Sequence, residues 1–270
     1  MKDKAVLITG GTMGIGLATG LEMGRLGADV TLTYKWGTAD LDSVRARFRA
    51  VGANEPDLVE ADAAVAEDTT MVLERIRSRG HERMHALVSN VSFAALVRTM
   101  DDYDERALDR SISYSTWPLV THLREAKRIF GRYPRHATGL SSGGPDHYYK
   151  DYDFVAATKA VLETLTRYLA YRLFDEDCRI NVVRSRLVRT QSLRETFGQN
   201  FEAFVERFNM DRQFISCEEV AGVIVALSSG LLDGMNGQVL MVDRGTTFFD
   251  NLMRIYEERD QLDLKTKEQR

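Results

Sequence analysis

The sequence predicts an α/β protein with a doubly wound, mostly parallel, seven-stranded sheet in a single domain. Short apolar runs alternate with segments of helical period along most of the chain, and a glycine-rich turn separates the first such pair. At 270 residues the chain is long enough to bury one sizeable core, and no linker divides it. Alternation of this kind indicates parallel strands with helices on both faces.

The elements are expected in the following order. Strands are predicted at residues 5–9, 30–34, 58–61, 86–90, 137–140, 179–183 and 238–242, and helices at residues 15–26, 41–51, 69–79, 107–130, 155–174 and 218–228. Residues 191–215 interrupt the alternation and are predicted to form a small helical substrate lid over the strand ends. The main domain is expected to span residues 1–249, followed by a charged helix and tail at 250–270.

Composition excludes several classes of partner. The 36 Lys and Arg residues face 40 Asp and Glu residues, and a net charge of −4 gives no general attraction to nucleic acid or to a membrane surface. Cys178 and Cys217 lie far apart and the five His residues show no ligand spacing, so no metal is expected. The first residues resemble a strand rather than a signal peptide, and no apolar run reaches the ~18 residues of a spanning helix. A cytoplasmic protein is therefore expected.

The turn after the first strand, residues 9–16, reads TGGTMGIG. Gly10, Gly14 and Gly16 would let backbone N–H groups and a helix dipole approach the pyrophosphate of a dinucleotide. An ordinary tight turn is the alternative. The position of the triplet, in the first strand–helix turn of a seven-strand pattern, favours dinucleotide binding.

From residue 5 to about residue 245 the chain resembles the short-chain dehydrogenase/reductase family, which has the Rossmann fold. The motif TGxxxGxG, the sequence SNVS at residues 89–92 in place of NNAG, RLVRT at 186–190 and DRG at 243–245 in place of DGG carry the resemblance. The turn and the matching positions together suggest these cofactor-binding residues: Gly10, Thr12, Met13, Gly14, Ile15, Gly16, Tyr34, Lys35, Asp62, Ala63, Asn90, Lys159, Val188 and Thr190.

The segment at residues 141–170, SSGGPDHYYKDYDFVAATKAVLETLTRYLA, is most similar to the enoyl-acyl-carrier-protein reductase III branch of that family. The family's usual YxxxK motif is absent, because Val155 stands four residues before Lys159. Tyr152 stands seven residues before it, in the Y-x6-K spacing of the branch, and a further Tyr, Tyr148, precedes it by four. The resemblance implies that Tyr152, Lys159 and Ser142 are catalytic.

The spacing has its own physical consequences. Seven helical steps return Tyr152 and Lys159 to nearly the same face, and an ammonium there is expected to lower the pKa of the phenol. In conjugate reduction the developing enolate oxygen lies two carbons beyond the carbon that receives hydride, so the acid must stand further away. Moving the Tyr by three residues shifts it by roughly 4.5 Å along a helix. A solvated Tyr and Lys at helical spacing is the alternative interpretation.

Two further departures from the family concern the active site. The segment at residues 111–115 reads SISYS, so that Ser113 or Ser115 is expected to replace the family's relay Asn. Arg184, Ser185 and Arg186 stand where the family has Pro-Gly.

Cofactor choice is set at the end of the second strand, where an acidic residue would hold the ribose hydroxyls of NAD. The chain has Tyr34 and Lys35 there and no acid before Asp40. A cation suits a 2′-phosphate, so NADPH is predicted. An exposed Lys without a ligand is the alternative.

An anionic substrate carrier is expected from the arginines of the strand end and lid: Arg184, Arg186, Arg189 and Arg194. Acyl carrier protein or CoA would fit, although such a lid can also be merely solvated. The predicted substrate contacts are Ser92, Tyr148 and Arg186.

Three functions remain open from the sequence. The first is reduction of an α,β-unsaturated thioester by NADPH, in fatty-acid-like or specialised-metabolite biosynthesis. The second is reduction of a ketone with Tyr152 or Tyr148 as the acid, and the third is a catalytically inactive dinucleotide-binding protein. The helices at 107–130 and 155–174 are apolar on more than one face, so a homodimer or homotetramer built on them is expected.

Overall fold

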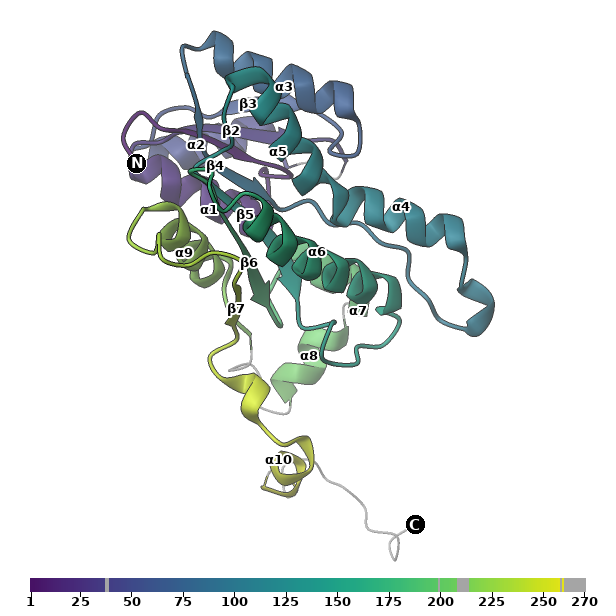
Figure 1. The fold of residues 1–270 in the computed structure, drawn as a ribbon. Coiled ribbons are helices and arrows are strands. Elements are labelled where there is room, and N and C mark those ends of the chain that lie inside the picture. The colour runs from purple at the N-terminus through teal and green to yellow at the C-terminus, as the bar shows by residue number, and fades with distance from the viewer. Residues whose placement is uncertain (37–38, 199, 208–213, 258, 260–270) are drawn as a thin grey trace, which may run out of the picture.

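The computed structural model describes residues 1–36, 39–198, 200–207, 214–257 and 259 (Figure 1). A parallel seven-stranded sheet with the order β3-β2-β1-β4-β5-β6-β7 runs through it. The strands are β1 (Ala5–Ile8), β2 (Asp29–Tyr34), β3 (Asp57–Glu60), β4 (Met84–Ser89), β5 (His136–Ser142), β6 (Arg179–Ser185) and β7 (Val239–Val242). The predicted doubly wound fold is confirmed, because the strand order reverses direction between β1 and β4.

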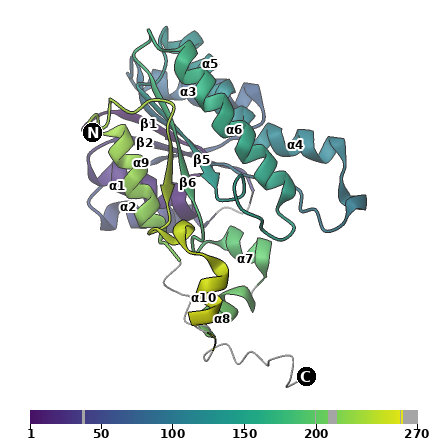
Figure 2. The same cartoon turned by 60° about the horizontal axis from the view of Figure 1, so that its bottom comes forward.

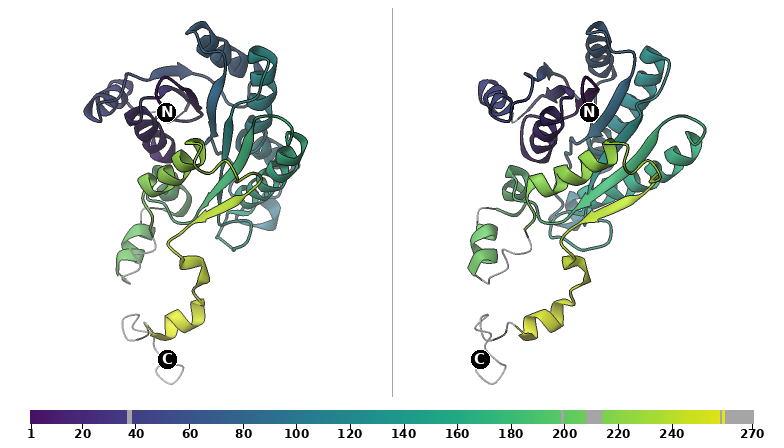
Figure 3. Two further views of the ribbon diagram at one scale, coloured as in Figure 1. Left: turned by 60° about the vertical axis from the view of Figure 1, so that its left-hand side comes forward. Right: turned by 90° about the vertical axis from the view of Figure 1, so that its left-hand side faces the viewer.

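Helices cover both faces of the sheet, as Figure 3 shows. One face carries α1 (Gly14–Arg25), α2 (Leu41–Ala50) and α9 (Cys217–Ser228), and the other carries α3 (Ala66–Ser78), α5 (Trp117–Phe130) and α6 (Asp153–Arg172). Successive residues of a strand point to opposite faces. In β1, Val6 and Ile8 accordingly join the first core, whereas Ala5 and Leu7 join the second.

The prediction of a single helix at 107–130 is wrong, because the chain forms two helices there. The structure has two helices there, α4 (Glu105–Ser115) and α5, separated at Thr116, whose φ and ψ are −126° and −54°. Pro118 lacks the N–H that would continue the ladder to the carbonyl of Tyr114. The break turns the Thr116 hydroxyl toward the carbonyl of Thr158 in α6, at 2.8 Å.

The predicted lid contains α7 (Gln191–Phe197) and α8 (Asn200–Arg207), and Figures 1 and 2 show both near the carboxyl ends of the strands. Residues 199 and 208–213 of this segment lie outside the described residues. Short 3₁₀ turns occur at Met100–Asp102 and Thr246–Phe248.

The C-terminal segment contains α10 (Asn251–Glu257), which stands away from the sheet in Figures 1 and 3. Its exposed side chains include Leu252, Met253 and Tyr256. Residues 258 and 260–270 of the predicted tail lie outside the described residues. Within the part of the chain that the structure describes, no helix is both long and apolar enough to cross a membrane.

Candidate cofactor and active site

The glycine turn brings backbone close to backbone between β1 and α1. Gly10 and Gly14 have positive φ values of 61° and 54°, which favour glycine. A Cβ on Gly16 would lie 2.7 Å from the carbonyl oxygen of Gly10, a contact that no side chain tolerates. Helix α1 begins at Gly14 without a side-chain hydrogen bond from its N-cap residue, Met13. The first N–H groups of α1 are therefore free of a side-chain cap and can bind an anionic group.

Asn90 joins this turn to the end of β4. Its side-chain amide donates to the carbonyl oxygens of Thr9 and Gly10, both at 3.0 Å, and its backbone N–H donates to the hydroxyl of Thr9 at 3.0 Å. These bonds cross the point where the strand order reverses, which is where open α/β sheets bind ligands. The structure therefore brings the predicted glycine and Asn90 positions together.

Asp62, which the family resemblance implies lies beside the adenine of the cofactor, is surrounded by polar and aromatic groups. Asp62 accepts hydrogen bonds from the backbone N–H of Ala64 at 2.9 Å and from the hydroxyl of Tyr114 at 3.2 Å. The ring of Tyr114 packs against those of Trp36 and Phe93, with centroids 5.4 and 5.7 Å apart. Burial, followed by the charge of Asp62, raises the pKa of Tyr114. Sequence reasoning missed Tyr114 and Trp36, because they come from α4 and from the turn after β2.

Lys35 has an acidic neighbour that the sequence prediction did not include. Its Nζ lies 3.1 Å from a carboxylate oxygen of Glu60, and that hydrogen bond raises the pKa of Lys35. The register pairs Tyr34 with Glu60 across β2 and β3, so the next residue after Tyr34 meets the Glu60 side chain. Lys35 is exposed and directly follows Tyr34, the last residue of β2, at the predicted position.

Tyr152 and Ser142 meet at the end of β5. Tyr152 is the N-cap residue of α6, and the hydroxyl of Ser142 is near enough to its phenol to act on the pKa of that group. The Ser142 hydroxyl also accepts from the backbone N–H of Gly144 at 3.3 Å. Burial raises the pKa of Tyr152 and outweighs the opposing effect of the Ser142 hydroxyl. The phenol is therefore protonated at neutral pH and able to act as an acid.

The predicted lowering of the Tyr152 pKa by Lys159 is wrong. Lys159 is 4% exposed, and its Nζ donates to the carbonyl of Leu140 at 2.8 Å. Tyr152 precedes the helix with a φ of −105°, so the two-turn alignment expected of helical residues does not apply to it. Burial lowers the pKa of Lys159 to about 8, against the opposing charge of Glu163. Val155, at the position of the family's usual Tyr, is buried.

An open pocket of about 320 Å³ adjoins Tyr152. Its lining includes Tyr149, which sequence reasoning missed, and the ring of Tyr149 lies 5.5 Å from that of Tyr152. Phe197 of α7 packs on both rings, each with its centroid 6.3 Å away. Tyr148 stands at the rim and is 86% exposed. The lid segment thus contacts the reacting end through Phe197, whereas Tyr148 points mainly to solvent.

The serines of α4 are divided between two faces. Ser111 and Ser115 are buried, and Ser115 donates to the carbonyl of Phe93 at 2.7 Å and lies 3.4 Å from the hydroxyl of Ser92. Ser113 is exposed and donates to the carbonyl of Asp109. Of the two predicted replacements for the relay Asn, only Ser115 faces the strand ends.

The residues that follow β6 lie in three different environments. Arg186 donates to the hydroxyls of Tyr149 at 3.4 Å and Thr246 at 3.3 Å. Val188 is buried and forms an isolated bridge with Ile215. Thr190 caps α7, and a Cβ on Gly14 would lie 3.7 Å from its methyl group. The predicted cofactor position Thr190 therefore lies beside the glycine turn, whereas Val188 is packed against the segment before α9.

The prediction that Arg184 belongs to the entrance is wrong. Arg184 is buried and forms ion pairs with Glu163 and Asp146, because β6 points its side chain beneath α6. Arg189 instead lies 4.9 Å above the ring centroid of Phe214. No group of three His, Cys, Asp or Glu side chains in the described residues is arranged to hold a metal ion.

The sheet, the glycine turn at the strand-order reversal and the Ser–Tyr–Lys positions define a dinucleotide-binding oxidoreductase fold. A family model described as Enoyl-(Acyl carrier protein) reductase matches residues 10–247. The chain belongs to this family of short-chain dehydrogenases/reductases.

Three known proteins are similar to this chain in sequence or in fold. The 1-cyclohexenylcarbonyl-CoA reductase of Streptomyces collinus is 28% identical over 245 residues, covering 88% of this chain and 85% of that protein. NADPH-dependent aldehyde reductase 2 of Arabidopsis thaliana is 23% identical over 259 residues, covering 91% and 94%. The crystal structure of levodione reductase aligns with a TM-score of 0.82 at 20% identity, covering 93% of this chain and 100% of that one. At 20% identity, the similarity to levodione reductase shows only a shared fold.

Proposed function

We propose that this chain is an NADPH-dependent reductase of the C=C bond of an α,β-unsaturated thioester, carried by CoA or acyl carrier protein, in fatty-acid-like or specialised-metabolite biosynthesis. The observation that carries the proposal is the placement of the phenol. Tyr152 meets Ser142 at the strand end, whereas Val155, at the usual acid position, is apolar and buried. The acid thus stands at the Y-x6-K spacing. A relative whose name describes a cyclohexenylcarbonyl-CoA reductase supports this chemistry.

The residues at the glycine turn fit a dinucleotide, because the close backbone packing there requires glycine and leaves the first N–H groups of α1 without a side-chain cap. Gly10, Gly14 and the first turn of α1 would hold the pyrophosphate. Asp62 would hold the adenine and Lys35 the 2′-phosphate, with the NADPH-dependent relative as support for this choice. When bound, the nicotinamide would supply a hydride to the β carbon of the substrate.

The remaining chemistry belongs to side chains at the end of β5. Burial keeps the Tyr152 hydroxyl protonated at neutral pH, so it can donate a hydrogen bond to the thioester oxygen as negative charge develops there. Ser142 orients that phenol. Lys159 has three N–H donors, and its bond to Leu140 leaves donors for the hydroxyls of the nicotinamide ribose.

A carbonyl reductase is the second candidate, and the proximity of the Ser142 and Tyr152 hydroxyls favours it. A pair of hydroxyls at a strand end can polarise a ketone or aldehyde oxygen, and one relative is named as an aldehyde reductase.

The deciding experiment follows NADPH absorbance in the purified protein with an enoyl-CoA and, separately, with a β-ketoacyl-CoA of equal chain length. Consumption with the enoyl thioester alone is expected. Consumption with the ketoacyl thioester alone would establish the second candidate. Tight NADPH binding without turnover of either would establish a catalytically inactive member of the family.

A further inference from the structure

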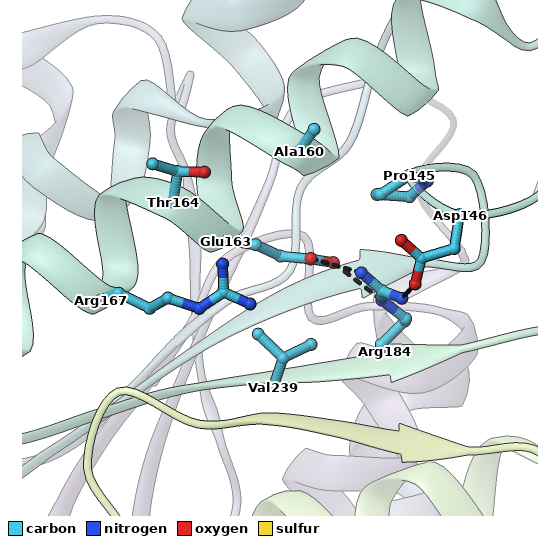
Figure 4. Close-up of a pocket in the computed structure, with 8 residues that line it drawn as sticks. All are labelled: Pro145, Asp146, Ala160, Glu163, Thr164, Arg167, Arg184 and Val239. Carbon is cyan, nitrogen blue, oxygen red and sulfur yellow. Dashed lines mark hydrogen bonds and ion pairs between the residues drawn. The ribbon is translucent and has the colours of Figure 1, made fainter.

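Arg184 is a buried cation that joins three elements. It lies on β6, and its guanidinium donates to both carboxylate oxygens of Glu163 on α6, with Nε 2.9 Å from Oε1. A further N–H group forms an ion pair with Asp146, in the loop between β5 and α6. Figure 4 shows these contacts side by side at the wall of an open pocket of about 430 Å³.

Glu163 completes the connection to β5. It is as buried as Arg184 and accepts a hydrogen bond from the hydroxyl of Ser141 at 2.5 Å. Ser141 and Arg184 are also directly paired in the register of β5 and β6. The neighbouring strands β5 and β6 and helix α6 are therefore joined by one carboxylate and one guanidinium.

The loop at residues 143–152 is the other partner of Arg184. The backbone N–H groups of Asp146 and His147 both donate to the carbonyl of Gly143, at 3.2 and 3.0 Å, which makes a tight turn. The loop ends at Tyr152, whose N–H donates to the carbonyl of Tyr149 at 3.3 Å. The ion pair with Asp146 attaches the middle of this loop to β6, in addition to the hydrogen bonds from Arg186 to the Tyr149 hydroxyl and from the Gly143 N–H to the carbonyl of Ser185.

Stability alone is a poor reason for such a cluster. Burying charges costs free energy that their attraction often only just offsets, so apolar side chains of similar volume serve stability equally well. Each charge here nonetheless attaches an element that carries a site residue. Glu163 lies one turn after Lys159 on α6, and Asp146 lies in the loop that ends at Tyr152.

We propose that Arg184 is a positioning residue for the reaction proposed above: through Asp146 it fixes the loop that places Tyr152 on Ser142, and through Glu163 it fixes the helix that carries Lys159. This inference rests on the proposed function. It assigns to Arg184 an internal role in place of contact with a substrate carrier.

The test replaces Asp146, the loop residue that pairs with Arg184, because Asp146 is exposed and its replacement leaves the core intact. Asp146→Asn is compared with Asp146→Glu, which keeps the charge, and with Asp151→Asn, which makes the same change elsewhere in the loop. Backbone hydrogen exchange is measured at residues 146, 147 and 152, together with kcat, the KM of the thioester and the affinity for NADPH. In Asp146→Asn exchange at these amides is expected to accelerate and kcat to fall about tenfold, with NADPH affinity unchanged. Asp146→Glu should keep the amide exchange rates and kcat close to those of the parent. Asp151→Asn should match the parent in both.

Unchanged exchange in Asp146→Asn would overturn the proposal, since the ion pair would then not hold the loop. Faster exchange with an unchanged kcat would also overturn it, because the position of the loop would not matter for the reaction. Exchange is measured without substrate, so a parent protein that reduces neither thioester refutes the proposed function separately, and the exchange rates then decide alone whether Arg184 fastens the loop.

Discussion

The Nζ atom of Lys159 lies 2.8 Å from the carbonyl oxygen of Leu140, so the lysine is anchored to β5 and not to the phenol of Tyr152. The phenol has its own partner, Ser142, at the same strand end. Lysine and tyrosine are therefore held independently. Substitutions at the two positions should have separable effects on cofactor binding and on turnover.

The affinity for NADPH should fall as the pH rises above about 8. Burial lowers the pKa of Lys159 to about 8, so the ammonium is present below that pH and is lost above it. A neutral amine is a weaker donor to ribose hydroxyls. Fluorescence titration of NADPH between pH 7 and 9.5 measures the effect, and Lys159→Arg should flatten the profile. A flat profile in the parent would contradict the assignment, and Lys159→Ala should weaken both binding and turnover.

Tyr152→Phe should lower kcat by a factor on the order of 10² to 10⁴ and leave NADPH affinity nearly unchanged, as expected when one positioned acid is lost. The ring and its packing on Phe197 remain in this variant, so the change isolates the hydroxyl. Steady-state kinetics with the enoyl thioester provide the measurement. Tyr133→Phe, which removes a hydroxyl from a ring beside Lys127, before the start of β5 and at the opposite end of that strand from Ser142, is the control. Parent-like kcat in Tyr152→Phe would refute the role of Tyr152.

Glu60 should weaken the preference for NADPH. Its carboxylate pairs with Lys35 at 3.1 Å and would repel a 2′-phosphate at the end of β2. Glu60→Gln is therefore expected to raise the ratio of NADPH to NADH in kcat/KM, and Lys35→Glu to lower it. Kinetics with both cofactors test the pair of variants together. A parent that favours NADH would show that Lys35 does not meet a phosphate.

Acid should destabilise the protein through His122. This side chain is buried with its Nδ1 2.7 Å from the carbonyl of Pro118, and burial lowers its pKa from 6.5 to about 4. Between these values the unfolded chain binds more protons than the folded one, so stability present above pH 6.5 is lost as the pH falls toward 4. A shift of this size corresponds to about 3 kcal/mol. Denaturant unfolding at pH 7 and 4.5 measures it, and His122→Gln should lose less on acidification. Equal losses in both proteins would exclude His122 as the cause.

The seven strands and the glycine turn could be predicted because apolar runs and glycine positions are local features of the sequence. The partner of Lys35 could not, since Glu60 reaches it only through the register of β2 and β3. The direction of Lys159 and the burial of Arg184 likewise depend on how α6 lies over β5 and β6. Tyr149 was missed because it lies in an irregular loop, where residue spacing gives no orientation. The sequence could thus indicate where along the chain the candidate site residues lie. Their contacts could be described only once the fold was known.

We expect the chain to form a homodimer or homotetramer through the outer face of α6. Leu162 is buried and Leu169 packs against the core below the helix, whereas Tyr168 and Tyr171 are 65% and 82% exposed on its outer side. Aromatic rings left in water along a helix favour a covering surface, and isologous pairing of the same face is the commonest arrangement. Tyr168→Glu should therefore lower the mass measured by light scattering toward the 30.5 kDa of one chain. Leu26→Glu, at the end of α1 on the opposite face of the sheet, should leave the mass unchanged. A parent mass near 30.5 kDa at micromolar concentration, or a Tyr168→Glu variant with the parent's mass, would count decisively against this assembly.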